Sequence, residues 1–348
     1  MTQNPFNISF GTEPLQNLSR DDTEQGIIET FCNPNPETES YILTGPRGCG
    51  KTVLLSQIKR AFERKNDWIA VDLNPCMEMH EQLAARIYES GKMKKLFLKT
   101  EFSFSFHGLS FSMSGDERVS DVYSLLKRMF TYLQKKNIKV FVTIDDISKN
   151  EYVKAFAHSF QSFLREGYKI FFVATGIYNN VASLNSDKAL TFLLRTPKIL
   201  VDPFSIRAVA LSYKEIFHLP LEKAVGLAKL TNGYAFAYQL LGSLLFKNQV
   251  TEVNEKILDE YDLILEDRVY SQIWKELTNR ERQIVTVLCQ NEGISNVEIA
   301  RKLQISPNAL EVYKKSLVFG GILATIERGK LGLLLPRFKE FVLFKTII

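Results

Sequence analysis

The sequence predicts an α/β fold in which helices flank a parallel β-sheet, followed by a helical lid domain and a C-terminal winged-helix domain. Three observations support this prediction. A glycine-rich loop joins an apolar strand at residues 41–44 to a helix that begins at residue 51. Apolar segments at residues 139–144 and 168–175 are typical of parallel strands buried on both faces, and an amphipathic helix lies between them. From residue 205 the pattern is wholly helical to about residue 274, and more helices and a hairpin follow.

The loop at residues 45–52 has the sequence GPRGCGKT, which fits the pattern G-x-x-x-x-G-K-[ST] at every fixed position. Its glycines allow consecutive backbone N–H groups to turn toward phosphates, and the following helix adds the positive end of its dipole. Lys51 is expected to contact the β- and γ-phosphates, and the Thr52 hydroxyl to bind Mg²⁺. The residues predicted to bind a nucleoside triphosphate are Gly45, Pro46, Arg47, Gly48, Cys49, Gly50, Lys51, Thr52 and Val53.

Two carboxylates, Asp145 and Asp146, follow the apolar segment 139–144. In an open parallel sheet, ligands bind beyond the carboxyl ends of the strands, so these acids and the glycine-rich loop are expected at the same edge. Asp145 is therefore predicted to hold Mg²⁺ together with Thr52.

The composition is that of a soluble globular protein, with 45% hydrophobic and 24% charged residues among 348. No segment approaches the roughly 18 apolar residues of a membrane span, and the N-terminus has no basic start followed by an apolar stretch. We expect a cytoplasmic enzyme with no membrane partner. Cys32, Cys49, Cys76 and Cys289 include no C-x-x-C pair and are expected to be free thiols.

The net charge of +5 is concentrated at the C-terminal end of the chain. Residues 278–348 contain eleven Lys or Arg and six Asp or Glu, so they account for the whole excess. Such a basic segment favours a polyanionic partner, although an ordinary soluble surface is an alternative explanation.

The same segment is expected to form a winged helix. Helices are predicted at residues 280–289, 295–303 and 307–319, and two strands within residues 322–335. In the second helix, Val297 is expected to be buried with the other apolar side chains.

The third of these helices would be the recognition helix, with Lys314 and Lys315 facing outward, and Arg328 and Lys330 would lie at the tip of the wing. Duplex DNA is the expected partner. A protein-docking module or an intramolecular lid is the alternative for the same architecture.

Two further residues have a functional and a structural explanation. Thr175 ends the segment 168–175, where its hydroxyl would orient the attacking water or would only cap the strand end. Arg195 precedes the Thr196-Pro197 break and hence ends a helix, whose C-terminal dipole a surface cation would complement.

Residues 102–113 alternate apolar and polar side chains on both sides of His107-Gly108-Leu109, which predicts a β-hairpin. Its apolar face would consist of Phe102, Phe104, Phe106, Phe111 and Met113. Because an isolated hairpin is only marginally stable in water, this face is expected to cover the protein's own core, a partner or a neighbouring subunit.

These features in this order resemble the P-loop ATPases of the AAA+ class and the related STAND ATPases, most closely archaeal-type ATPases and replication-initiator-like proteins that end in a winged helix. The resemblance spans nearly the whole chain. The segment that begins with Asn4-Pro5-Phe6 is similar to one that in such ATPases leads to a Gly-Arg pair near the adenine. Here the pair is Ser19-Arg20.

The resemblance also implies roles for single residues. Asp146 stands where many AAA+ proteins have a catalytic Glu, whereas STAND members often have two Asp residues. Arg195 matches the arginine finger of AAA+ proteins, which completes the site of a neighbouring subunit, so a homo-oligomer is implied. Residues 233–237 lack the Arg of the AAA+ lid sensor and are similar to the Gly-x-Pro-Leu-Ala segment of STAND proteins.

Together these points predict an ATP-binding and ATP-hydrolysing switch protein that acts on DNA, with ATP and Mg²⁺ as its ligands and with Asp146, Arg195 and Thr175 as catalytic residues. The predicted domains are residues 1–204, with a hairpin insertion near 96–115, then 205–275 and 276–348. The competing hypothesis is a signalling or defence ATPase whose winged helix docks protein or is autoinhibitory. A DNA-binding regulator with a vestigial ATPase is disfavoured by the intact loop and by Asp145.

Overall fold

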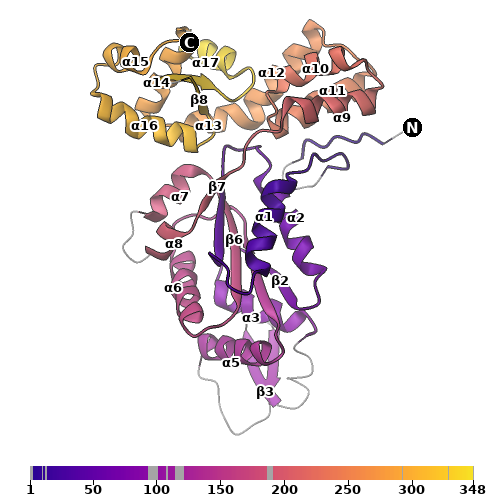
Figure 1. The fold of residues 1–348 in the computed structure, drawn as a ribbon, viewed down its shortest axis with the longest axis vertical. Coiled ribbons are helices and arrows are strands. Elements are labelled where there is room, and N and C mark those ends of the chain that lie inside the picture. Colours follow the sequence, from indigo (N-terminus) through magenta and orange to yellow (C-terminus); the bar gives the residue numbers. More distant parts are fainter. Residues whose placement is uncertain are drawn as a thin grey trace.

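The structure, a computed structural model, describes residues 3–9, 11, 14–92, 101–106, 109–113, 121–185, 191–291, 293–327 and 329–347. Figure 1 shows two bodies: a sheet with its covering helices, and above it a row of helices from the C-terminal part of the chain. The N-terminal segment runs along the helical body before it enters the sheet body at α1 (Asp21–Cys32).

The main sheet has five strands in the order β2-β5-β6-β1-β7, and every neighbouring pair is parallel. The strands are β1 (Ser40–Thr44), β2 (Trp68–Leu73), β5 (Lys139–Ile144), β6 (Ile170–Gly176) and β7 (Lys198–Leu200). Every residue of β6 is buried, as are all but the first of β5. The prediction of a parallel sheet with doubly buried central strands is confirmed.

Helices cover both faces of this sheet (Figure 1). On one face α1 and α2 (Lys51–Glu63) pack on Phe141 and Phe171, which belong to one hydrophobic core. On the other face α3 (Met79–Glu89), α5 (Val122–Lys135) and α6 (Glu151–Arg165) pack on alternate strand residues such as Val142 and Phe172. The alternation of side chains along each strand produces these two cores.

The predicted hairpin is present as strands β3 (Glu101–Phe106) and β4 (Leu109–Met113), which pair antiparallel. The register places Phe104 opposite Phe111 and Phe106 opposite Leu109. His107 and Gly108 lie outside the described residues, and the apolar face of the hairpin stays a prediction.

The remaining helices of the sheet body are α7 (Tyr178–Asn185) and α8 (Thr191–Arg195). The first part of the helical body consists of α9 (Ile206–Phe217), α10 (Leu221–Thr231), α11 (Ala235–Asn248), α12 (Glu255–Leu265), the π-helix η2 (Glu266–Tyr270) and α13 (Ser271–Glu276). The N-terminal segment is attached to it through Phe6, which is buried and packs against the rings of Tyr213, Phe217 and Tyr238. The ring lies against Gly242, where any side chain would overlap it.

The C-terminal part consists of α14 (Asn279–Gln290), α15 (Asn296–Lys302), α16 (Pro307–Phe319), the antiparallel strands β8 (Leu323–Glu327) and β9 (Lys330–Leu333), and α17 (Phe338–Ile347). Capping boxes begin α14 and α15, where the side chains of Thr278 and Ser295 accept from backbone N–H groups. The expectation that Val297 is buried is wrong, because its side chain is 76% exposed. In this short helix Val297 points well away from the face that buries Ile299 and Ala300.

Throughout the described part of the chain, the helices lack the length and apolar character needed to cross a membrane.

Candidate functional site

The loop at residues 45–52 connects β1 to α2 at the carboxyl edge of the sheet. Gly50, directly before α2, has a φ of 95°, a conformation that L residues with a side chain rarely adopt. Gly48 has a φ of 75°, and a Cβ there would lie 2.6 Å from the Tyr234 hydroxyl. The two glycines are thus required by backbone conformation at both positions and by close packing at Gly48.

Lys51 is the first residue of α2, and its ammonium turns back over the loop. Its Nζ donates hydrogen bonds to the carbonyl oxygens of Gly45 and Pro46, each at 2.9 Å. The positive charge therefore lies at the helix N-terminus inside the curve of the loop, where an anion is favoured.

The predicted metal-binding residues lie together. The Thr52 hydroxyl is 3.1 Å from both carboxylate oxygens of Asp145. Both groups offer oxygen atoms, which are the ligands that Mg²⁺ prefers, and in such sites one or two protein ligands are completed by phosphate and water. The two side chains therefore fit the Mg²⁺ that accompanies a nucleoside triphosphate. No cluster of three or more His, Cys, Asp or Glu side chains is found in the described part of the chain.

Thr175 links the two acids that follow β5. Its hydroxyl donates to Asp145 Oδ1 at 2.5 Å and accepts from the backbone N–H of Asp146 at 2.9 Å. The side chain is 1% exposed. The hydroxyl donates its only proton to Asp145, so it has no proton to donate to a water molecule. This geometry makes Thr175 a residue that positions the two carboxylates.

Asp146 is exposed and has a φ of 55°, in the left-handed region. Its carboxylate therefore faces solvent at the same sheet edge as the loop.

Arg195 lies away from the loop. It ends α8 just before β7, and its neighbour Thr196 hydrogen-bonds to Ser40 at the start of β1 at 3.1 Å. Arg195 thus lies at the amino edge of the sheet, opposite the loop of its own chain.

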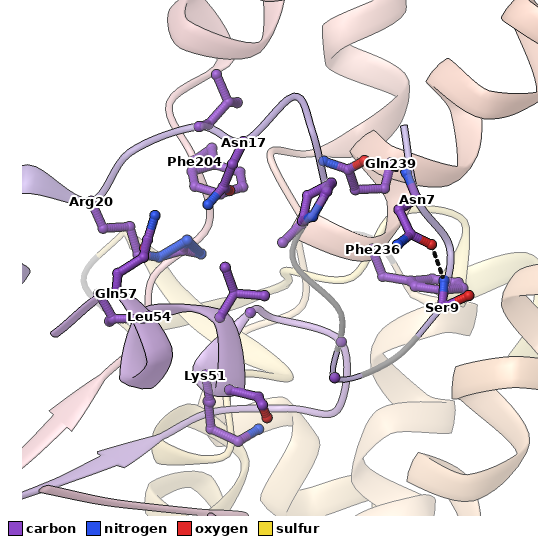
Figure 2. A pocket seen from close by; sticks show the side chains of 18 residues that line it. Asn7, Ser9, Asn17, Arg20, Lys51, Leu54, Gln57, Phe204, Phe236 and Gln239 are labelled. Atoms are coloured by element: carbon purple, nitrogen blue, oxygen red, sulfur yellow. Dashed lines mark hydrogen bonds between the residues drawn. The ribbon is translucent and has the colours of Figure 1, made fainter. Parts of the chain in front are cut away.

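A pocket extends from the loop between α2, the N-terminal segment and α11 (Figure 2). Its walls include Leu54, Phe204 and Phe236, and its polar side chains include Asn7 and Gln57. An apolar pocket that opens directly beside a phosphate-binding loop is suited to a nucleoside base.

Arg20 forms one side of this pocket (Figure 2). Its Nη2 donates to the carbonyl oxygens of Cys49 and Asp202, both at 2.8 Å, and its guanidinium lies 4.0 Å from the centre of the Phe204 ring. Burial lowers the pKa of Arg20 from its ordinary value, and the Cys49 thiol and the Asp202 carboxylate oppose this shift. Arg20 thus joins the loop to the segment that leads from β7 into the helical body.

The helical body contacts the loop through the start of α11. The Tyr234 hydroxyl donates to the Arg47 carbonyl, and the Phe236 N–H donates to the Gly48 carbonyl at 3.0 Å. Burial raises the pKa of Tyr234 well above its ordinary value, so the hydroxyl keeps its proton and acts as a donor.

Helix α13 and the C-terminal part contact the other side of the loop. Arg47 forms an ion pair with Glu276 at 2.7 Å, and Pro46 packs against Gly321 where a side chain would overlap it. Nearby, the rings of Tyr178 on α7 and Phe319 on α16 are stacked with their centres 5.7 Å apart. None of these three contacts was predicted, because the paired residues lie more than 100 positions apart in the sequence.

Two family models match parts of the chain. The KAP family P-loop domain matches residues 20–156, and a domain of unknown function, DUF8462, matches residues 267–342. No curated protein matches the chain in sequence.

Solved structures of similar fold cover almost the whole chain. The Walker-type ATPase of Pyrococcus abyssi is 14% identical, with a TM-score of 0.62 over 93% of this chain and 95% of that one. The ORC2 protein of Aeropyrum pernix, solved with ADPNP and ADP, is 11% identical with a TM-score of 0.53, and Cdc6p of Pyrobaculum aerophilum is 14% identical with 0.50. Each of these two comparisons covers 98% of both chains. The fold is that of a P-loop NTPase.

The role of Thr175 can be tested by Thr175→Val, which keeps the shape and removes the hydroxyl. The N–H of Asp146 then loses its acceptor at a partly buried position, so we expect the free energy of unfolding to fall by about 1–3 kcal/mol. Thr325→Val, at an exposed strand position, should change it by less than about 0.5 kcal/mol. Urea unfolding of both variants measures this, and equal stabilities would contradict the assigned hydrogen bonds.

Proposed function

We propose that this protein is an ATP-hydrolysing switch of the AAA+ and STAND type, with three domains at residues 1–204, 205–275 and 276–348, and that the last domain is a winged helix that binds duplex DNA. The observation that carries this proposal is the double contact of the loop: Arg47 is bonded to Tyr234 on one side and to Glu276 on the other. A ligand on the loop therefore acts directly on the elements that hold the C-terminal domain.

In this proposal Lys51 moves from the loop carbonyls to the β- and γ-phosphates, which its charge then neutralises. Thr52 and Asp145 hold Mg²⁺, which when bound neutralises charge on the phosphate oxygens. Asp146 orients the attacking water, and Thr175 keeps both acids in place. Because the Asp146 side chain is one methylene shorter than Glu, we expect slow hydrolysis.

Arg195 lies at the opposite edge of the sheet from the loop of its own chain. Its exposed guanidinium is thus available to a second copy, as the resemblance to an arginine finger implies. A homo-oligomer in the ATP-bound state is part of the proposal.

The proposed phosphate and metal residues are tested separately. Lys51→Ala should abolish ATP binding, because it removes the cation that contacts the phosphates in the ground state. Asp145→Asn should retain binding and lose turnover, because the metal loses its anionic ligand. Calorimetry and phosphate release measure these effects, with Asp259→Asn, exposed on α12, as the control. Equal ATP binding by Lys51→Ala and the unchanged protein would refute the assignment.

The DNA part of the proposal is supported by charge and exposure. The exposed side chains of α16 include Asn308, Glu311 and Lys315. Lys314 and Lys330, which were predicted to contact DNA, form ion pairs within the protein. Lys314 lies 3.2 Å from Glu311, and Lys330 lies 3.0 Å from Glu327. Arg328 lies outside the described residues, so Lys315 is the contact to test first.

Each lysine that neutralises a DNA phosphate releases counterions, so the logarithm of affinity falls with the logarithm of salt concentration by about 0.9 per contact. We expect Lys315→Ala to weaken duplex binding and to reduce this slope by about one, with no change in sequence preference. Fluorescence anisotropy at several salt concentrations measures it. Lys214→Ala, at an exposed position of α9, is the control. The absence of duplex binding at low salt, with and without ATP, would exclude DNA.

A second candidate function is a resting-state lock, in which the C-terminal domain holds the nucleotide loop and a protein partner releases it. The contacts that favour it are the Arg47–Glu276 ion pair, the Tyr178–Phe319 stack and the hydrogen bond from the Asn179 amide to the Glu276 carbonyl at 3.3 Å. They join α13 and the C-terminal part to the loop and to α7.

This lock can be weakened at Phe319 and compared with Val312 on the same helix. Their exposed fractions are 50% and 67%, but only Phe319 stacks on Tyr178. An aromatic pair contributes about 0.5–1.5 kcal/mol, so Phe319→Ala should raise the undocked population about 2- to 12-fold. Hydrogen exchange of residues 45–48 would report this as faster exchange, whereas Val312→Ala should leave it unchanged. Identical exchange in the two variants would argue against the lock.

A further inference from the structure

We infer that Gln57 selects adenine nucleotides by pairing with the N6 and N7 atoms of the base. This inference rests on the proposed function, since it concerns the base of the nucleotide whose phosphates bind the loop. It follows from the position of Gln57 in the pocket and from its amide, whose donor and acceptor are both without a partner in the described part of the chain.

Gln57 lies on the pocket side of α2. Val53, Leu54 and Gln57 line the pocket together, and their spacing of three and four residues places them on one helix face. At 1.5 Å per residue, Gln57 lies about 9 Å along the helix from Lys51. This distance separates the base end of the pocket from its phosphate end. Figure 2 shows Gln57 beside Arg20 and Leu54.

Two other amide side chains of the pocket, Gln239 and Asn7, have protein partners. Gln239 accepts from the Asn7 N–H at 3.0 Å and donates to the Gln16 carbonyl at 2.8 Å. The Asn7 side chain accepts from the Ser9 N–H at 2.8 Å. These groups hold the N-terminal segment on α11, so they shape the pocket.

The two cations of the pocket are occupied as well. Lys51 is bonded to loop carbonyls and is assigned to phosphate, and Arg20 is bonded to two carbonyls and stacked on Phe204. By contrast, the half-buried amide of Gln57 makes no hydrogen bond within the part of the chain that the structure describes. Its donor and its acceptor are both available to a ligand.

An amide fits only one purine at the N6/N7 edge. Adenine presents a donor at N6 beside an acceptor at N7, which matches the oxygen and nitrogen of a glutamine amide. Guanine presents two acceptors, O6 and N7, which require two donors such as those of Arg or Lys. At the other base edge a rotated amide fits both purines and would select neither. Selection by Gln57 therefore requires the N6/N7 edge and favours adenine.

The test compares ATP, GTP and 7-deaza-ATP, which lacks the N7 acceptor, by calorimetry on the full chain. For the unchanged protein we expect ATP to bind about tenfold more tightly than either of the other nucleotides. Gln57→Leu should weaken ATP by about the same factor and leave GTP unchanged, so these two affinities converge. It should weaken 7-deaza-ATP less than ATP, because 7-deaza-ATP loses only the N6 hydrogen bond. Gln57→Glu keeps an acceptor for N6 but has no donor for N7, so it should lose the preference for ATP over 7-deaza-ATP.

Gln161→Leu, at an exposed position of α6, is the matched control and should retain the preference for ATP. Thermal melting of each variant checks that it folds. If the unchanged protein binds the three nucleotides equally, or if Gln57→Leu keeps its preference, the inference is overturned while the nucleotide loop stands. If the unchanged protein binds none of them, the proposed function itself fails and the inference fails with it.

Discussion

The backbone of residues 45–48 is the point on which the other parts of the molecule depend. Its carbonyl oxygens accept hydrogen bonds from the Lys51 ammonium, the Tyr234 hydroxyl and the N–H groups of Phe236 and Cys49. A buried loop must satisfy its polar groups, and here elements distant in sequence do so. With the carbonyls bound by protein groups, the loop N–H groups other than that of Cys49 are the ones left for an anion.

The N-terminal segment makes the second connection between the two bodies. Phe6 is anchored in the helical body, and Asn7, the next residue, lines the pocket beside the loop. Arg20, at the end of the same segment, is bonded to the Cys49 carbonyl. A single stretch of chain thus contacts the helical body, the pocket and the glycine-rich loop, so it connects these three parts.

Strands and helices that a short stretch of sequence identifies by its apolar pattern or its first residue could be predicted. Examples are the buried strand at residues 139–144 and the helix that begins at Pro307. The strand at residues 68–73 was not predicted, because the charged Asp72 interrupts its apolar run. In the candidate site, the grouping of Thr52 with Asp145 followed from sheet topology. The ion pair between Arg47 and Glu276 could not be predicted from the residues around either position, because only the folded chain brings the two side chains together.

The backbone at Asp146 limits which acid can occupy that position. With a φ of 55°, the residue has the left-handed conformation, which Asp and Asn adopt more readily than other residues with a side chain. A glutamate there would gain reach toward a water molecule but would be less compatible with the turn that follows β5. The backbone conformation after β5 therefore favours the shorter acid, and a longer acid at this position would add strain to the turn.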